Sequence, residues 1–154
     1  MAGLYFEEFE DGMVIDHPIR RTITESDNTL FSVMTMNPAA LHLDHHYAQT
    51  QTEFGKPLVN SLFTLGLMIC ISVHDTTLGT TVANLGMTDV VYPKPVFHGD
   101  TIRVETRVIS KRASKSRPTQ GIVEFDHVAF NQHGDEVARC RRQALMLMQP
   151  KETA

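Results

Sequence analysis

The chain has 154 residues, of which 42% are hydrophobic and 21% are charged, and its net charge at pH 7 is −4. This length and composition exclude a disordered chain and predict one folded domain, residues 1–154, with a sizeable core. The negative net charge argues against a dedicated nucleic-acid-binding protein.

The distribution of apolar residues and cysteines predicts where the protein is found. The longest apolar stretch, residues 57–73, contains polar side chains and is shorter than the roughly 20 residues of a membrane span. The acidic N-terminus lacks the basic and apolar segments of a signal peptide. Cys70 and Cys140 form no CxxC motif, so we expect a reduced, cytoplasmic protein. Cys70, within the apolar stretch, is expected to be buried.

The first half of the chain predicts a strand followed by helices. Residues 13–23 read as a strand, and Thr-Glu-Ser-Asp at 24–27 is typical of a capping box that opens a helix. Three apolar side chains of this helix are expected to share one face: Leu30, Phe31 and Met34. The helix is expected to end near Asn37-Pro38, because proline disfavours helical backbone in the residue before it. Residues 42–51 predict a short helical turn.

The second half predicts one apolar helix followed by strands. The helix covers about residues 60–73. Strand patterns follow at 80–92, 101–113, 121–132 and 136–148. Apolar and charged residues alternate most clearly in 101–113, and His133-Gly134-Asp135 predicts a hairpin between the last two strands. Helices followed by strands predict an α+β fold, with a mostly antiparallel sheet wrapped around the apolar helix.

The segment 34–46, MTMNPAALHLDHH, contains the strongest candidate for a functional residue. Asn37-Pro38 starts a turn and holds His42 at a fixed offset along the chain. The imidazole of a histidine titrates near neutral pH, so a histidine held at a turn is a candidate general acid or base.

Several motifs in order resemble the MaoC-like dehydratases, also called (R)-specific enoyl-CoA hydratases. The segments that carry the resemblance are residues 22–31, Asn37-Pro38 with His42, FGKPLVNS at 54–61, PVFHGDT at 95–101 and NQHG at 131–134. The resemblance implies a single hot-dog domain, in which an antiparallel sheet wraps around a central helix. It also implies a hydro-lyase that acts on a coenzyme A thioester and needs neither a metal nor a separate cofactor.

Within this family the chain is most similar to the branch that hydrates short branched or dicarboxylic enoyl-CoAs, such as the mesaconyl-CoA and itaconyl-CoA hydratases. TMNPAALHLD at 35–44 and VNSL at 59–62 carry this narrower likeness. The chain departs from the family motif Asp-x-Asn-Pro-x-His in two ways. Thr35 replaces the aspartate, and three residues instead of one separate the proline from His42. In addition, Ser61 replaces a frequent glycine at the start of the central helix.

The resemblance implies that His42 is the acid–base residue, with a structural turn histidine as the alternative. The departure at Thr35 leaves the partner of His42 unassigned, because a threonine hydroxyl can hold a water but cannot act as a base near neutral pH. Three side chains are candidates for this role. Asn37 is suited to orient the ring or the water, Asp44 lies two residues from His42, and Asp27 also suits the capping box.

Adding water to an enoyl thioester also requires donors that stabilise negative charge on the thioester oxygen. Asn60, Ser61 and Leu62, at the start of the central helix, offer backbone N–H groups and the helix dipole for this purpose. His98 is either a contact to the acyl group or a turn residue. Asn84 either lies beside the pocket or occupies a β-bulge.

Charged and histidine-rich segments suggest two further sites. Four basic side chains are suited to the phosphates of coenzyme A, with a solvated loop as the alternative: Lys111, Arg112, Lys115 and Arg117. The turn at 42–46 contains three histidines and an aspartate, but neither HExxH nor CxxC accompanies them. A polar turn without a metal is therefore expected there.

We therefore expect an enoyl-CoA hydratase that binds a small acyl-CoA substrate and neither nucleic acid nor a membrane. A hot-dog acyl-CoA thioesterase and a non-catalytic acyl-CoA-binding protein are the alternatives. The second alternative arises because Thr35 stands where the family motif has an aspartate. Hot-dog proteins commonly pair, so we expect a homodimer or a higher homo-oligomer. A long edge strand such as 101–113 would otherwise invite aggregation.

Overall fold

A computed structural model describes residues 3–150 of the chain. Its elements in chain order are η1 (Phe6–Glu8), β1 (Val14–Asp16), β2 (Arg21–Thr22), α1 (Glu25–Met34), α2 (Ala40–Leu43), α3 (His45–Gln51), α4 (Ser61–Thr76), β3 (Thr81–Val91), β4 (Thr101–Ala113), β5 (Gln120–Phe130) and β6 (Glu136–Leu147).

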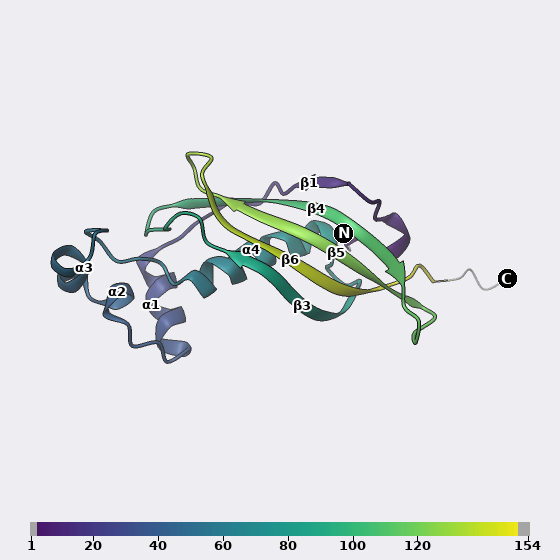
Figure 1. Cartoon of the computed structure of the whole chain (residues 1–154), viewed down its shortest axis with the longest axis horizontal. Coiled ribbons are helices and arrows are strands. Elements are labelled where there is room, and N and C mark those ends of the chain that lie inside the picture. Colours follow the sequence, from purple (N-terminus) through teal and green to yellow (C-terminus); the bar gives the residue numbers. More distant parts are fainter. Residues whose placement is uncertain (1–2, 151–154) are drawn as a thin grey trace.

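The strands form one antiparallel sheet in the order β1-β4-β5-β6-β3, with β2 also paired to β4. Helix α4 lies against one face of this sheet, while α1, α2 and α3 gather beyond one end of it (Figure 1). The predicted sheet around an apolar helix is confirmed, and β4 has the predicted bounds. The expectation that residues 101–113 form an edge is wrong, because β4 lies inside the sheet and β3 is the long strand at its edge.

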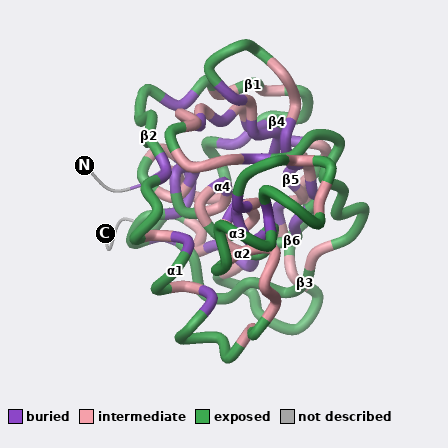
Figure 2. The backbone as a smooth tube through the Cα atoms, turned by 90° about the vertical axis from the view of Figure 1, so that its left-hand side faces the viewer, coloured by how far each residue is buried: buried purple, intermediate pink, exposed green. Residues whose placement is uncertain are grey.

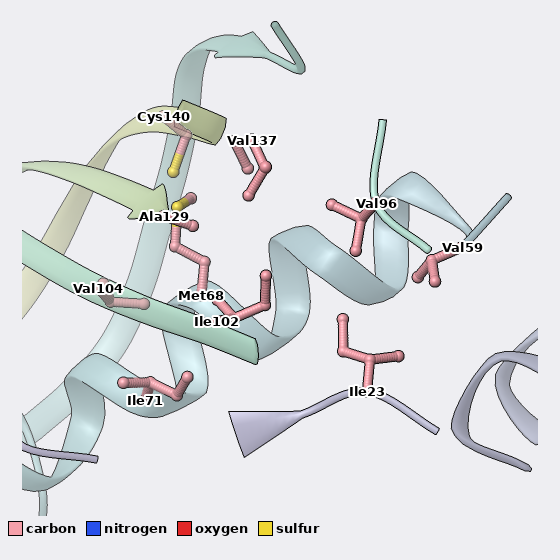
Figure 3. Packing of buried hydrophobic residues seen from close by; sticks show 11 residues of the cluster. Ile23, Val59, Met68, Ile71, Val96, Ile102, Val104, Ala129, Val137 and Cys140 are labelled. Carbon is pink, nitrogen blue, oxygen red and sulfur yellow. The ribbon is translucent and has the colours of Figure 1, made fainter. Parts of the chain in front are cut away.

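Most of the core lies between α4 and the sheet. Met68 and Ile71 of α4 belong to one buried cluster with Ile102 and Val104 of β4 (Figure 3). Alternate residues of β4 are buried, as the alternating sequence predicts. Burying each such side chain contributes about 1.5–3 kcal/mol, so this cluster fixes α4 on the sheet and thereby fixes the position of its N-terminus.

The predicted first strand is interrupted. Instead of one strand over 13–23, the short strands β1 and β2 both pair with β4. Between them lie His17, whose side chain is buried, and Pro18. Proline has no N–H to give to a ladder, and the imidazole of His17 turns inward to bind Asp75 and Thr106. Both features explain why the strand breaks there.

Helix α1 buries polar residues and exposes apolar ones. The capping box at Thr24 and Asp27 opens it as predicted. Its buried residues are Asn28 and Ser32, whereas Leu30 is 62% exposed and Met34 is 80% exposed. Leu30 and Met34, which their spacing places on one face of the helix, therefore both face outward. The polar network described below, rather than apolar packing, draws the other face of α1 inward.

Two surfaces stay uncovered in the described part of the chain. Both faces of β3 are exposed over nearly its whole length, whereas β4 and β5 carry many buried residues (Figure 2). Along α4, exposed residues recur every fourth position at Leu62, Gly66, Cys70 and His74. The expectation that Cys70 is buried is therefore wrong, because it lies on this outward stripe of the helix.

Candidate active site

Asn28 of α1 links the segments that surround the start of α4. Its side chain is fully buried. Its Nδ2 donates to the carbonyl oxygens of His42 and Leu58, at 3.2 Å in each case, and to Nε2 of His98 at 3.0 Å. Its Oδ1 accepts a hydrogen bond from the backbone N–H of Asn60 at 2.8 Å. One amide therefore joins α1, α2, the turn before β4 and the segment that leads into α4.

A backbone carbonyl orients the ring of His42, which lies in α2. The ring Nδ1 donates to the carbonyl oxygen of Leu58 at 2.7 Å. This contact places a hydrogen on Nδ1, because a carbonyl oxygen only accepts. In the neutral ring, Nε2 then carries the lone pair that can accept a proton. Asn28 donates to the same carbonyl oxygen and so helps to hold the carbonyl group that orients the ring.

The side chains predicted as partners of His42 are engaged elsewhere. Thr35 donates its hydroxyl to a carbonyl of its own helix at 2.8 Å. The Asn37 side chain accepts from the backbone N–H two residues later, and Asp44 caps α3. Asp27 completes the capping box of α1. Within residues 3–150, none of these four side chains forms a hydrogen bond with the ring of His42.

The start of α4 retains free backbone donors. Asn60 caps the helix, and its Oδ1 accepts from the N–H of Leu62 at 3.0 Å. This bond uses a donor that the sequence analysis assigned to the substrate. The N–H groups of Ser61 and Phe63 meet no acceptor among the described residues, so these two are the free donors at the positive end of the helix dipole.

His98 belongs to the same network through Asn28. Because the Asn28 amide donates to Nε2 of His98, the hydrogen of the neutral ring lies on Nδ1. Burial lowers the pKa of His98; Glu25 opposes this shift and the nearby His45 reinforces it. His45 in turn contacts Glu25 at 2.8 Å. His98 is therefore a neutral group near pH 7, placed beside the segment that carries His42.

A pocket of about 230 Å³ opens beside the start of α4. Leu58, whose carbonyl orients His42, and Ser61, the first residue of α4, both line it. The rest of its lining is mainly apolar with a few polar side chains: Phe54, Val59, Thr64, Tyr92, Pro93, Lys94, Pro95, Val96 and Val137. Val59 and Val96 are also part of the core around the first turns of α4 (Figure 3).

Of the predicted site residues, Ser61 lines this pocket, whereas His42 and the others are not part of the lining. Asn84 is exposed in β3 and precedes a register shift, which agrees with the bulge interpretation. The basic cluster is at the far end of β4 and in the hairpin after it: Lys111, Arg112, Lys115 and Arg117. β4 has 13 residues and so spans about 40 Å, with the site at its beginning and the cluster at its end (Figure 1).

Three residues of the site were missed in the sequence: Asn28, Leu58 and Phe63, whose N–H is one of the two free donors. Asn28 has a weak signal, because it and Ser32 are polar residues one helical turn apart and would share a face of α1. Leu58 contributes its carbonyl oxygen, and a backbone contribution of this kind has no signature in side-chain identity.

The described residues contain no group of three or more His, Cys, Asp or Glu side chains that could hold a metal ion. The histidines at 42–46 are thus not gathered into such a group. Among the helices described, none is both long and apolar enough to span a membrane. The cytoplasmic location stays a prediction.

Comparison with known proteins places this arrangement in context. Residues 8–129 match the model of the MaoC like domain family. The chain is 32% identical to a mesaconyl-CoA hydratase of Cereibacter sphaeroides over 136 residues, which are 88% of this chain and 39% of that protein. It is 33% identical to a beta-methylmalyl-CoA dehydratase of Chloroflexus aurantiacus over 135 residues, or 88% of this chain and 37% of that protein. The chain thus spans well under half the length of these relatives.

The fold is also seen in solved structures. A Mycobacterium tuberculosis protein with a double hot-dog fold superposes with a TM-score of 0.87 at 21% identity, covering 99% of this chain and 46% of that one. The sheet wrapped around α4 is therefore a hot-dog fold.

Proposed function

The chain belongs to the MaoC-like domain family, and from this premise we propose that it catalyses the reversible addition of water to a short enoyl-CoA thioester. The observation that carries the proposal is the position of His42, whose ring is oriented by the Leu58 carbonyl next to the pocket that Leu58 and Ser61 line. The proposal makes the protein a hydro-lyase that takes coenzyme A as part of its substrate and needs no separate cofactor.

In this proposal His42 supplies both the base and the acid. Its Nε2 takes a proton from water as the water oxygen bonds to Cβ of the substrate. The same nitrogen then returns that proton to Cα, so the double bond is replaced by a C–O bond and a C–H bond. The carbonyl of Leu58 holds Nδ1–H throughout, which is the orienting task usually given to a carboxylate. The proposed reaction is then compatible with Thr35 in place of the family aspartate, because no carboxylate is needed at that position to orient the ring.

The start of α4 stabilises the charge that develops on the thioester oxygen. The free N–H groups of Ser61 and Phe63 are at the end of the helix where the dipole favours negative charge. Removing one donor of this kind typically costs about 10²–10³ in rate. Asn28 connects this donor site to His42, since it binds both the Asn60 N–H and the Leu58 carbonyl.

The substrate within this class is a short acyl group that is branched or carries a second carboxylate. The names of the two relatives, a mesaconyl-CoA hydratase and a beta-methylmalyl-CoA dehydratase, support this choice. The size of the pocket supports it as well, because about 230 Å³ is below the roughly 300–1,000 Å³ typical of sites for drug-sized ligands.

The proposed assembly is a homodimer or a higher homo-oligomer. The exposed edge strand β3 and the outward stripe of α4 from Leu62 to His74 are surfaces that a second copy would cover. The apolar side chains Leu62, Val82 and Leu85 are among those exposed there. An acyl-CoA is the proposed small-molecule partner.

The test is product analysis with crotonyl-CoA, mesaconyl-CoA and itaconyl-CoA. Loss of the conjugated thioester absorbance and release of free thiol are followed together. Loss of absorbance without thiol is the expected result and identifies a hydratase. Thiol release would instead identify a thioesterase, and tight binding without any conversion would identify an acyl-CoA-binding protein.

A further inference from the structure

A buried hydroxyl without a partner lies in the wall of the pocket. Thr64 is 2% exposed, and its Oγ1 forms no hydrogen bond with any of the described residues. Thr64 lines the pocket three residues after Ser61, and thus about 4.5 Å further along α4. Threonines inside helices usually donate back to a carbonyl of the preceding turn, as Thr76 does with Ser72 at 2.5 Å. Thr64 does not, so its hydroxyl is left without an acceptor among the described residues.

The other polar groups of the pocket are also donors. Besides Thr64, the polar lining consists of the hydroxyls of Ser61 and Tyr92 and the ammonium group of Lys94. The lining includes neither a carboxylate nor a side-chain amide. Burial raises the pKa of Tyr92, which keeps its hydroxyl protonated. Among residues 3–150, the one carboxylate that contacts Lys94 is that of Asp135, which lies outside the lining. This set of groups suits an anionic acceptor.

We propose that Thr64 determines specificity by donating a hydrogen bond to a carboxylate on the acyl group, a role that rests on the proposed hydration of an enoyl-CoA. The thioester lies at the N-terminus of α4, and the second carboxylate lies one turn deeper, against Thr64. A separation of about 4.5 Å corresponds to a short diacid and excludes a long chain. Ser61 and Tyr92 bind the remaining carboxylate lone pairs, and the ammonium group of Lys94, which Asp135 also binds, lies at the wall.

Thr64→Val tests this role because it removes the hydroxyl and keeps the shape of the side chain. The measured quantity is the ratio of kcat/KM for mesaconyl-CoA to that for crotonyl-CoA, which lacks the second carboxylate. A hydrogen bond to a charged group corresponds to about 10- to 100-fold in this ratio. Thr64→Val should lower the ratio by that factor, through mesaconyl-CoA alone, and Thr64→Ser should restore it.

Thr76→Val is the matched control, since it removes another buried threonine hydroxyl from α4 outside the pocket. It should leave the ratio unchanged. If Thr64→Val slows both substrates equally, or neither, Thr64 does not read the carboxylate and the proposal is overturned. Circular dichroism establishes that each variant is folded before the comparison.

Binding of saturated thioesters separates this proposal from the proposed reaction. Succinyl-CoA and butyryl-CoA have no double bond to hydrate, and calorimetry measures their affinities directly. Tighter binding of succinyl-CoA that is lost in Thr64→Val supports the role of Thr64 even if no enoyl-CoA is converted. Hydration of crotonyl-CoA, with equal affinities for the two saturated thioesters in the wild type, would retain the reaction and reject the role of Thr64.

Discussion

A hydrogen-bonded histidine lies near each end of α4, His42 at the start and His17 at the end. The two hydrogen-bond networks differ in whether a ring nitrogen stays free for a substrate. At the N-terminal end, Asn28 holds the segment of His42, which is half-buried and whose Nε2 has no hydrogen-bond partner within residues 3–150. At the C-terminal end, Asp75 accepts from Nδ1 of His17 at 2.9 Å. Both networks tie α4 to neighbouring elements, but they are built around different centres: an amide in the first and a carboxylate in the second.

The network at the C-terminal end forms a chain of donors and acceptors. Because a carboxylate only accepts, His17 carries a hydrogen on Nδ1, and its Nε2 forms a hydrogen bond with the Thr106 hydroxyl at 2.8 Å. The same hydroxyl forms a second hydrogen bond with Nδ1 of His127 at 2.8 Å. Asp75, His17 and Thr106 thus repeat the order of groups found in an acid–base relay.

Access distinguishes the two networks. His17 is 2% exposed, and Thr106 and His127 are 0% exposed, so no substrate reaches the relay at the C-terminal end. At the other end a pocket is lined by Leu58, the residue whose carbonyl oxygen binds the imidazole of His42. A hydrogen-bonded histidine therefore identifies a candidate active site only when it has a free nitrogen and a pocket next to it. The following variants test this distinction.

The largest expected effect comes from replacing the histidine near each end of α4 by alanine. His42→Ala should lower kcat by about 10²–10⁴, the usual contribution of general acid–base catalysis. His17→Ala should leave kcat nearly unchanged but lower the free energy of unfolding by about 1–3 kcal/mol, because it removes one hydrogen bond from Asp75 and one from the buried Thr106 hydroxyl. Turnover and urea unfolding measure the two effects. A folded His17→Ala variant that has lost its turnover would show that both networks serve the reaction.

The next effect is expected at Asn28. Asn28→Asp keeps an acceptor for the Asn60 N–H but cannot donate to Leu58 or His98. We expect kcat to fall by about 10²-fold, because a displacement of about 1 Å is enough for such a loss. KM should change much less.

The matched control for this variant is Ser32→Ala, on the same face of α1. The Ser32 hydroxyl is buried without a partner in the described part of the chain, so its loss should change neither kcat nor stability appreciably. Equal losses in the Asn28 and Ser32 variants would mean that α1 acts only as a structural support. Restoration of kcat by a substitution that returns an N–H donor at residue 28 would favour the positioning role.

A pH-dependent effect on stability is expected from the C-terminal network. Burial lowers the pKa of His127 well below its ordinary value, and the charges of Arg142 and His17 act in the same direction. Below about pH 6.5, residue 127 is therefore protonated in the unfolded chain while the buried imidazole of the folded protein stays neutral. The free energy of unfolding then decreases by up to about 1.4 kcal/mol per pH unit as the pH falls. For Asp75, burial raises the pKa but hydrogen bonds from His74 and His17 lower it overall. The contribution of Asp75 to stability is therefore present above pH 3.8, the ordinary pKa of the carboxyl group, and is lost only in more acidic solution.

Urea unfolding at several pH values between 7.5 and 5 checks this prediction. His127→Phe should flatten the dependence, whereas His133→Gln, in the exposed hairpin, should keep it. An unchanged slope in His127→Phe would assign the effect to another group.

The sequence predicts the fold better than the site, for physical reasons. Alternation in β4, the capping box of α1 and the apolar run of α4 are local patterns, and each gave the correct element. The edge strand was assigned to β4 instead of β3 because strand order depends on contacts between distant segments. Likewise, the sequence did not indicate which face of α1 is buried, because Asn28 and its distant partners select that face and leave Leu30 exposed.

Within the site, the sequence indicated His42 and the start of α4, since both follow from turn and helix-end chemistry. It could not indicate that the Leu58 carbonyl orients His42, because a backbone group bonds in the same way whatever its side chain. It also assigned the Leu62 N–H to the substrate, although the Asn60 side chain caps it. Contacts of this kind depend on conformation rather than on residue identity.

The smallest expected effect concerns the predicted coenzyme A cluster. Replacing Lys115 and Arg117 together by alanine should change KM for an acyl-CoA by less than about twofold, because the two ends of β4 are about 40 Å apart and exposed charges are screened beyond roughly 10 Å in 0.1 M salt. Steady-state kinetics at 0.1 M salt measure this. Lys111 is left in place because its ammonium group binds the carbonyls of Phe6 and Glu7. A rise in KM of tenfold or more with crotonyl-CoA, absent with a thioester of pantetheine alone, would restore the phosphate role. It would also require a second copy to bring its cluster to the pocket of the first.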